Sequence, residues 1–387
     1  MIRPSHVVCF LAILAQFVFA EWARSQETDK KLERIAADWK RRQERFTRVQ
    51  YEVRGNVMIP RENIMDERNK PIHTDSESGN IDAPFSWTLL LDFENNRHRL
   101  VDEQHYYSVP EKKLFKRSTI AAFDGKSHWV SIKRDGDPER KSTDSDIAIR
   151  SGDLRVYRIG SDKFPAFYGH GIVPYAGAGR LFAGQLTLDT DTDQFTIHGQ
   201  AVYQGRQCIV ARTQPQQGTD TFFDELWIDL SRESAVVRHA RYGGNTPITD
   251  TYVSYRQVQN CWLPDRWEAT LRQGRKVINI VQARVESLEL QPAVAEADFR
   301  IAELPGMLVS VGVIPKWEDE SKSPPEAQGV RRFRIDETGH RQEVIFENGI
   351  EKHLRPRNWA WWLVGVLLLA VCGAVAIVWR RRLAAKR

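Results

Sequence analysis

Apolar and polar residues alternate with a period of two in many short segments between residues 49 and 290. Every second residue is apolar from Val49 to Val53. Residues 87–93 place four large apolar side chains on one face, namely Trp87, Leu89, Leu91 and Phe93. Such segments, separated by Gly, Asn and Asp, are typical of antiparallel strands with one covered face, and we expect about ten to twelve of them.

Residues 28–46 follow a helical period instead. Leu32, Ile35, Trp39 and Phe46 recur at helical spacing, and lysines and arginines occupy the opposite side. The pattern predicts one amphipathic helix before the first strand, and a solvated basic side is favoured over a lipid-binding one. The expected fold class is therefore mainly β (α+β), an antiparallel sheet with an N-terminal helix.

Both ends of the chain are apolar. Residues 1–20 contain the uncharged run VVCFLAILAQFVFA, which has the length of a signal-peptide core and is too short to span a bilayer. We predict a signal peptide over 1–20, with cleavage after Ala20 and a cut after Ser25 as the alternative. The uncharged run from Trp359 to Trp379 is long enough to span a membrane as a helix and has tryptophans at both ends, so 359–379 is a predicted transmembrane helix.

The charge distribution orients this predicted helix. The tail 380–387, RRRLAAKR, has five positive charges and no negative one, which places it in the cytoplasm and the body outside. We therefore expect a single-pass protein of a bacterial inner membrane with a periplasmic body. The net charge of +5 comes from Arg3 and this tail, and the rest of the chain has one more acidic than basic residue. A basic stripe within the body is missing, so nucleic acid is not an expected partner.

The segment between body and membrane has two parts. We expect the body to cover residues 21–317. Residues 318–330 include EDESKSPPEAQG, which has the composition of a linker. Residues 331–350 are predicted to form a small β-hairpin that turns near Glu337–Gly339 and acts as a stalk.

Two cysteines remain in the body, Cys208 and Cys261, since Cys9 lies in the signal peptide and Cys372 in the predicted membrane helix. An even pair in an exported domain predicts a disulfide, because disulfides persist outside the cytoplasm. The alternative is two independent buried thiols.

Catalytic signatures are missing from the sequence, which contains no G-x-S-x-G, phosphate-binding loop, G-x-G-x-x-G or H-E-x-x-H motif. We predict neither an enzyme nor a cofactor. The segment AAFDGKSHWVSI groups Asp124, Lys126 and His128, but Asp-Gly between two alternating segments predicts a tight hairpin turn. These residues therefore indicate a corner of the sheet and no catalytic cluster.

One weak metal candidate exists in residues 189–200. Asp189, Asp191 and Asp193 match the first ligand positions of a calcium loop. Gln194 replaces the glycine of such a loop and Gln200 its final glutamate, so a solvated turn is favoured over a calcium site.

The order of these segments resembles the lipoprotein-carrier superfamily of LolA-type, LppX-type and RseB-type domains. The resemblance covers residues 28–300 and is carried by the helix followed by LLLDFENNRHRLV, AFDGKSHWVSI, GRQCIVARTQ, LWIDLSRESAVVRHARYGG and CWLPDRW. It implies a strongly curved half-barrel sheet around an apolar cavity, with lid segments. It differs in the predicted membrane anchor, and no ligand contact of the family can be transferred residue by residue.

Two functions follow as expectations. The first is a membrane-anchored binding protein that accepts a lipid, an acyl chain or a lipidated peptide, with Trp87, Leu89, Leu91 and Phe93 as candidate cavity lining. These four residues can equally pack against the helix as ordinary core. The second is an RseB-like sensor domain that binds a membrane protein partner.

Overall fold

The computed structural model describes residues 27–61, 79–108, 113–135, 146–152, 163–173, 194–213, 222–316, 326–347 and 350–353. These residues form a sheet of 17 strands, a helix over residues 27–45, the short helix α2 (Phe164–Tyr168) and two 3-10 turns, η5 (Leu230–Arg232) and η6 (Glu296–Phe299). The prediction of a mainly β fold with an N-terminal helix is confirmed.

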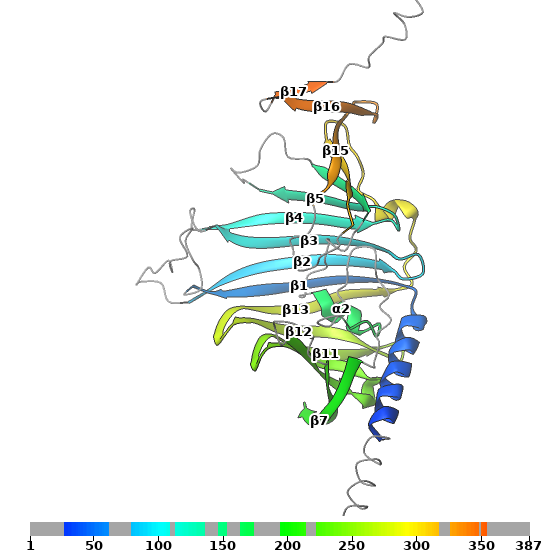
Figure 1. Cartoon of the computed structure of the whole chain (residues 1–387), viewed down its shortest axis with the longest axis vertical. Coiled ribbons are helices and arrows are strands. Elements are labelled where there is room, and N and C mark those ends of the chain that lie inside the picture. The colour runs from blue at the N-terminus through cyan, green and yellow to red at the C-terminus, as the bar shows by residue number, and fades with distance from the viewer. Residues whose placement is uncertain are drawn as a thin grey trace, which may run out of the picture.

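The sheet has two arms that meet at β1 (Arg48–Pro60). The first arm continues through β2 (Asn80–Asp92), β3 (Arg97–Ser108), β4 (Lys113–Phe123), β5 (His128–Arg134) and β6 (Ile147–Gly152). The second arm consists of β7 (Phe195–Tyr203), β8 (Arg206–Thr213), β9 (Phe222–Asp229), β10 (Ala235–Gly243), β11 (Thr246–Val258), β12 (Cys261–Gln273) and β13 (Lys276–Leu290). β1 pairs with β2 on one side and with β13 on the other. This order, with β3, β2, β1, β13 and β12 side by side, can be followed in Figure 1.

The first arm is extended by the C-terminal strands β14 (Leu308–Ile314), β15 (Gln328–Ile335), β16 (Arg341–Glu347) and β17 (Ile350–His353). β14 pairs in parallel with β6, whereas the other described pairs are antiparallel. Residues 331–350, expected as a separate stalk, thus belong mostly to β15 and β16, and β15 continues the main sheet through β14. The physical reason is the edge of β6, which offers unpaired backbone groups to β14.

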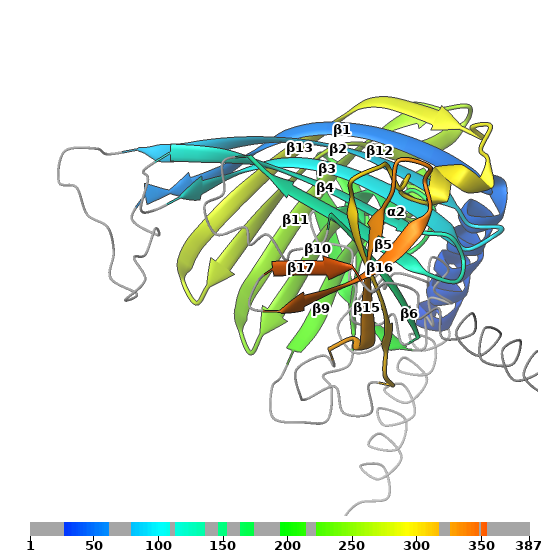
Figure 2. The same ribbon diagram turned by 90° about the horizontal axis from the view of Figure 1, so that it is seen from above.

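The sheet is strongly curved. Seen from above, β1 and β2 form the roof, and β9, β10 and β11 turn downwards, so that the two arms enclose a concave face (Figure 2). α2 lies inside this curve, and the N-terminal helix lies at one end of the strands (Figures 1 and 2). The half-barrel with a helix and a lid segment, which the resemblance implied, is therefore present.

The main core lies between the concave face and the two helices. Ile35 and Trp39 of the N-terminal helix and Phe167 of α2 are buried against apolar residues of β1 and β2. The Nε1 of Trp39 donates to the carbonyl oxygen of Ser234 at 2.8 Å. The apolar stripe of the helix therefore covers one end of the sheet, and burial of these side chains stabilises the fold by about 2 kcal/mol each.

Arg42 fastens this helix to three loops. Its guanidinium is 2 % exposed and donates to the backbone oxygens of Gly169, Arg232, Glu233 and Trp262 at 2.6–3.1 Å. These four residues lie next to α2, in the β9–β10 connection and at the start of β12. Burial lowers the pKa of Arg42. One arginine therefore connects the helix, α2 and the second arm.

The expected disulfide is not formed, since Cys208 and Cys261, both within the described residues, are free and buried. Cys208 belongs to the main core, whereas Cys261 packs with Phe46 and Leu263 in a separate small cluster. Arg45 of the helix contacts the Sγ of Cys261. The two thiols thus serve two different packing units, which corrects the sequence-based expectation in favour of its alternative.

The predicted signal peptide, membrane helix and basic tail lie outside the described residues. Within the residues that the structure describes, none of the helices is both long and apolar enough to cross a bilayer.

Candidate functional site

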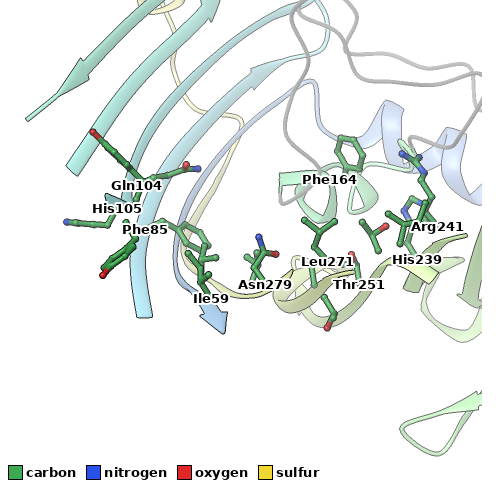
Figure 3. A pocket seen from close by; sticks show the side chains of 18 of the residues that line it. Ile59, Phe85, Gln104, His105, Phe164, His239, Arg241, Thr251, Leu271 and Asn279 are labelled. Carbon is green, nitrogen blue, oxygen red and sulfur yellow. The ribbon is translucent and has the colours of Figure 1, made fainter. Parts of the chain in front are cut away.

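The concave face contains an open cavity of about 720 Å³. This volume lies within the ~300–1,000 Å³ range of small-molecule sites. Figure 3 shows one group of lining side chains on the first arm and β1, with Ile59, Phe85 and His105, and a second group with Phe164, Leu271 and His239. The lining changes from largely apolar to largely polar along the cavity, and the two ends are described in turn.

The apolar wall depends on a glycine. Phe85 of β2 lies across β1 at Gly55, where a Cβ atom would lie 2.3 Å from the Phe85 ring and 2.2 Å from the carbonyl oxygen of Gln282. Only glycine leaves room for this ring. Val57 and Val281 on the neighbouring strands β1 and β13 continue the wall. The result is an aromatic and aliphatic surface open to the cavity.

The polar end consists of four side chains joined by hydrogen bonds. The hydroxyl of Tyr168 lies 2.6 Å from Nδ1 of His239, and Nε2 of His239 lies 2.9 Å from Oδ1 of Asp224. Arg241 donates from Nε to Oδ1 of Asp224 at 3.0 Å and from Nη2 to Oδ2 at 3.3 Å. Tyr168, His239 and Arg241 line the cavity, and Asp224 is fully buried behind them.

The charges fix the direction of these hydrogen bonds. Burial raises the pKa of the Asp224 carboxyl, but hydrogen bonds and charge from His239 and Arg241 outweigh it and lower the pKa to about 2. The charged carboxylate can only accept, so Nε2 of neutral His239 donates to it and Nδ1 accepts from the Tyr168 hydroxyl. Burial raises the pKa of Tyr168 well above its usual value, so this hydroxyl keeps its proton. A lone pair of Tyr168 and the Nη1 group of Arg241 are left to face a ligand.

α2 is held in place from several sides. Lys163, at its start, forms a buried ion pair with Asp102 of β3 at 3.1 Å. His170, just after it, contacts the Tyr51 hydroxyl of β1 through Nε2 at 2.8 Å. Together with the Arg42–Gly169 hydrogen bond, these contacts fix the position of Tyr168 at the cavity.

The candidate lining residues of the sequence analysis lie beside this cavity. Trp87, Leu89 and Leu91 are buried in the main core, and Phe93 packs on the ring of His170 at a centroid distance of 5.2 Å. Phe85, two residues earlier on the same face, reaches the cavity instead. The structure contains no ligand against which these four can be tested, so their role as lining stays a prediction.

The Asp124 segment is a corner, as the sequence predicts. The Asp124 carboxylate accepts hydrogen bonds from the backbone nitrogens of Lys126 and Ser127, and Gly125 has a φ of +92°. His128 is buried on β5, away from the turn.

The calcium candidates Asp189, Asp191 and Asp193 lie outside the described residues. A search of the described ranges finds no group of three His, Cys, Asp or Glu side chains that could hold a metal ion.

Sequence reasoning missed the polar cluster because its members come from three separate segments. Tyr168 belongs to α2, Asp224 to β9, and His239 and Arg241 to β10. A signal was present in AVVRHARY, where the inward face of the strand changes from Val237 to His239 and Arg241. An apolar face that turns polar over two positions indicates a strand that leaves the core and enters a cavity.

Comparison with known proteins finds no matching family model and no matching curated protein. The chain is similar to three solved structures. A domain provisionally described as an outer membrane lipoprotein-sorting protein, from Vibrio parahaemolyticus, has 13% identity and a TM-score of 0.37, with 70% of this chain and 97% of that chain covered. A DUF1329 family protein from Desulfovibrio piger has 10% identity and a TM-score of 0.39, with 70% and 96% covered. A LolA superfamily protein from Nitrosomonas europaea has 9% identity and a TM-score of 0.37, with 69% and 96% covered.

These similarities concern the fold alone. Because the TM-scores are low, the proposals below are argued from the residues of this chain. The matches include the superfamily that the sequence resembles.

Proposed function

We propose that this protein is a binding protein that holds a lipid, an acyl chain or a lipidated peptide in the cavity of its concave face. The observation that supports this most directly is the cavity itself, with an apolar wall around Phe85 and a polar end at Tyr168 and Arg241. A ligand with an oily chain and a polar head group matches both ends.

The apolar wall supplies the affinity in this proposal. Each methylene group that a chain buries against Phe85, Leu271 or Val281 contributes about 0.8 kcal/mol, which is about fourfold in the dissociation constant. The polar end supplies orientation, because a head group with a donor and an acceptor can bond both the Tyr168 oxygen and the free Arg241 group.

We assign no catalytic step to the Tyr168–His239–Asp224 cluster. Tyr168 keeps its proton, and both ring nitrogens of His239 are engaged in hydrogen bonds within the cluster. No base is therefore left to accept a proton from a ligand.

The proposal includes the location expected from the sequence. Residues 359–379 anchor the protein in the cytoplasmic membrane, the body lies outside, and residues 380–387 remain inside. The ligand would then be taken up at or near the membrane surface to which the body is attached.

Photo-crosslinking of the full chain with diazirine fatty acids of increasing length tests the function. The label is expected on peptides of β2, β12 and β13, with apparent affinity rising up to about fourfold per methylene until the cavity is filled. An Ala269→Trp variant fills the cavity and should lose the label, because Ala269 lines it. Val202→Trp is the matched control, since Val202 is 67% exposed on β7. Equal labelling of both variants, or label spread over the convex surface, would contradict the proposal.

A further inference from the structure

A row of hydrogen-bond donors crosses the sheet at its centre, on the face opposite the cavity. The strand register places Arg54 of β1 opposite Arg284 of β13, and Arg284 opposite Arg266 of β12. A hydroxyl follows at each end, Ser254 of β11 opposite Arg266 and Ser86 of β2 opposite Arg54. Neighbouring strands lie about 4.8 Å apart, so three guanidinium groups stand side by side within about 10 Å.

The alternation of the strands fixes the side of the sheet. Val53, Trp267 and Val285, each next to one of the arginines, are buried in the main core. Successive side chains of a strand point to opposite faces, so the arginines lie on the convex face. The side chain of Arg284 is 72% exposed.

Three adjacent cations are costly for a sheet, since like charges directly opposite one another are destabilising. Arg54 and Arg266 form no ion pair with a residue of the described ranges, and Arg284 has a loose contact with Glu286 at 3.9 Å. The row is therefore not neutralised by the neighbouring strands, and an anion from outside would relieve the repulsion.

The row lies in a groove of about 580 Å³ that has its own wall. Tyr203, from the β7–β8 hairpin, stacks on Tyr252 of β11 with ring centroids 5.8 Å apart, and both rings line the groove. Glu268 is the single acidic residue among the described residues of this lining, and Gln282 donates to its Oε2 at 2.8 Å. Three arginines against one engaged glutamate give the groove a positive charge.

We infer that this groove, defined by Arg54, Arg284 and Arg266, binds a phosphate group. Guanidinium groups form paired, charge-assisted hydrogen bonds with phosphate oxygens, and a phosphate offers more acceptor oxygens than a carboxylate. The donors of the row outnumber what a single carboxylate can accept. The phosphate can belong to a small phosphoester or to the head group of an anionic phospholipid, and the site is independent of the ligand in the cavity.

Calorimetry and thermal unfolding of the full chain in a non-ionic detergent test this site. Glycerol 3-phosphate serves as the soluble phosphoester and acetate as the carboxylate. Mixed micelles that contain phosphatidylglycerol are compared with micelles that contain phosphatidylcholine. Binding of glycerol 3-phosphate identifies a soluble phosphoester, and a rise in melting temperature with phosphatidylglycerol alone identifies a lipid head group.

Two variants make the result specific. Arg284→Gln and, separately, Arg266→Gln should weaken binding at least about tenfold, since each removes charge-assisted hydrogen bonds. Without ligand, Arg284→Gln should raise the melting temperature, because it removes a like charge from between two others. Arg331→Gln on β15 changes the net charge equally at an exposed residue bound to Glu343, and it should leave binding unchanged.

Three results would overturn the inference. They are no response to either phosphate probe, acetate binding as tight as phosphate binding, and an equal loss of affinity in the Arg331→Gln variant and the two row variants.

Discussion

Replacement of Arg42 by methionine should destabilise the folded body more than any other change on the N-terminal helix. The variant keeps most of the aliphatic volume and removes the guanidinium that donates to four backbone oxygens. Other side chains of the helix make fewer such connections between separate parts of the fold. Arg34, for comparison, donates to one backbone oxygen, that of Leu230, from an exposed position.

The magnitude follows from the surroundings of each oxygen. The bond to Gly169 is buried, and leaving its oxygen without a partner costs about 2 kcal/mol. The three other oxygens are partly buried and can be reached by water, so about 1 kcal/mol applies to each. The expected loss in the free energy of unfolding is about 5 kcal/mol. The matched variant Arg34→Met should lose less than about 1 kcal/mol.

Urea unfolding followed by tryptophan fluorescence measures both variants, since Trp39 lies in the same helix and is buried. Equal losses for Arg42→Met and Arg34→Met would refute the assignment of Arg42 as the connection between helix and loops. A second consequence is loss of the cavity ligand in Arg42→Met, because the bond to Gly169 helps to position α2.

Three further predictions concern other parts of the fold. Gly55→Ala should lower stability by about 1–3 kcal/mol and displace Phe85 from the cavity wall, as measured by unfolding and by fatty-acid labelling, because its Cβ meets the Gln282 backbone. Burial lowers the pKa of His98 to about 4, so the unfolded chain binds more protons than the folded one between pH 6.5 and 4. Stability should fall by about 3 kcal/mol as the pH decreases through this window, and His98→Asn should remove that part of the slope in pH-dependent unfolding. Cys208 and Cys261 should both react with iodoacetamide in guanidinium without a reductant, and peptide masses that lack either adduct would contradict the free thiols.

The alternation of residues was sufficient to predict the strands and their covered face. Residues 87–93 lie almost entirely within β2, and Trp87, Leu89 and Leu91 do share the buried face. The pattern could not tell which part of that face packs under a helix and which part stays open. That division depends on where the N-terminal helix and α2 lie along the strand, and these contacts join residues far apart in sequence.

The polar end of the cavity and the arginine row required the register of the sheet. Arg54 and Arg284 are 230 positions apart, and neither segment alone distinguishes an arginine on an ordinary solvated face from one that stands opposite a second arginine. The Asp124 corner, by contrast, depends on adjacent residues alone and could be predicted.

The position of β1 has a consequence for the order in which the chain can fold. β1 pairs with β13 from Val49↔Leu290 to Met58↔Ile280, so one long edge of β1 stays without its partner until residues 276–290 have been synthesised. Each arm consists mainly of hairpins between consecutive strands, which can form early, whereas the joint between the arms closes a loop of more than two hundred residues. The nascent protein therefore carries an uncovered strand edge for most of its synthesis, and this interval is when protection by a chaperone matters most.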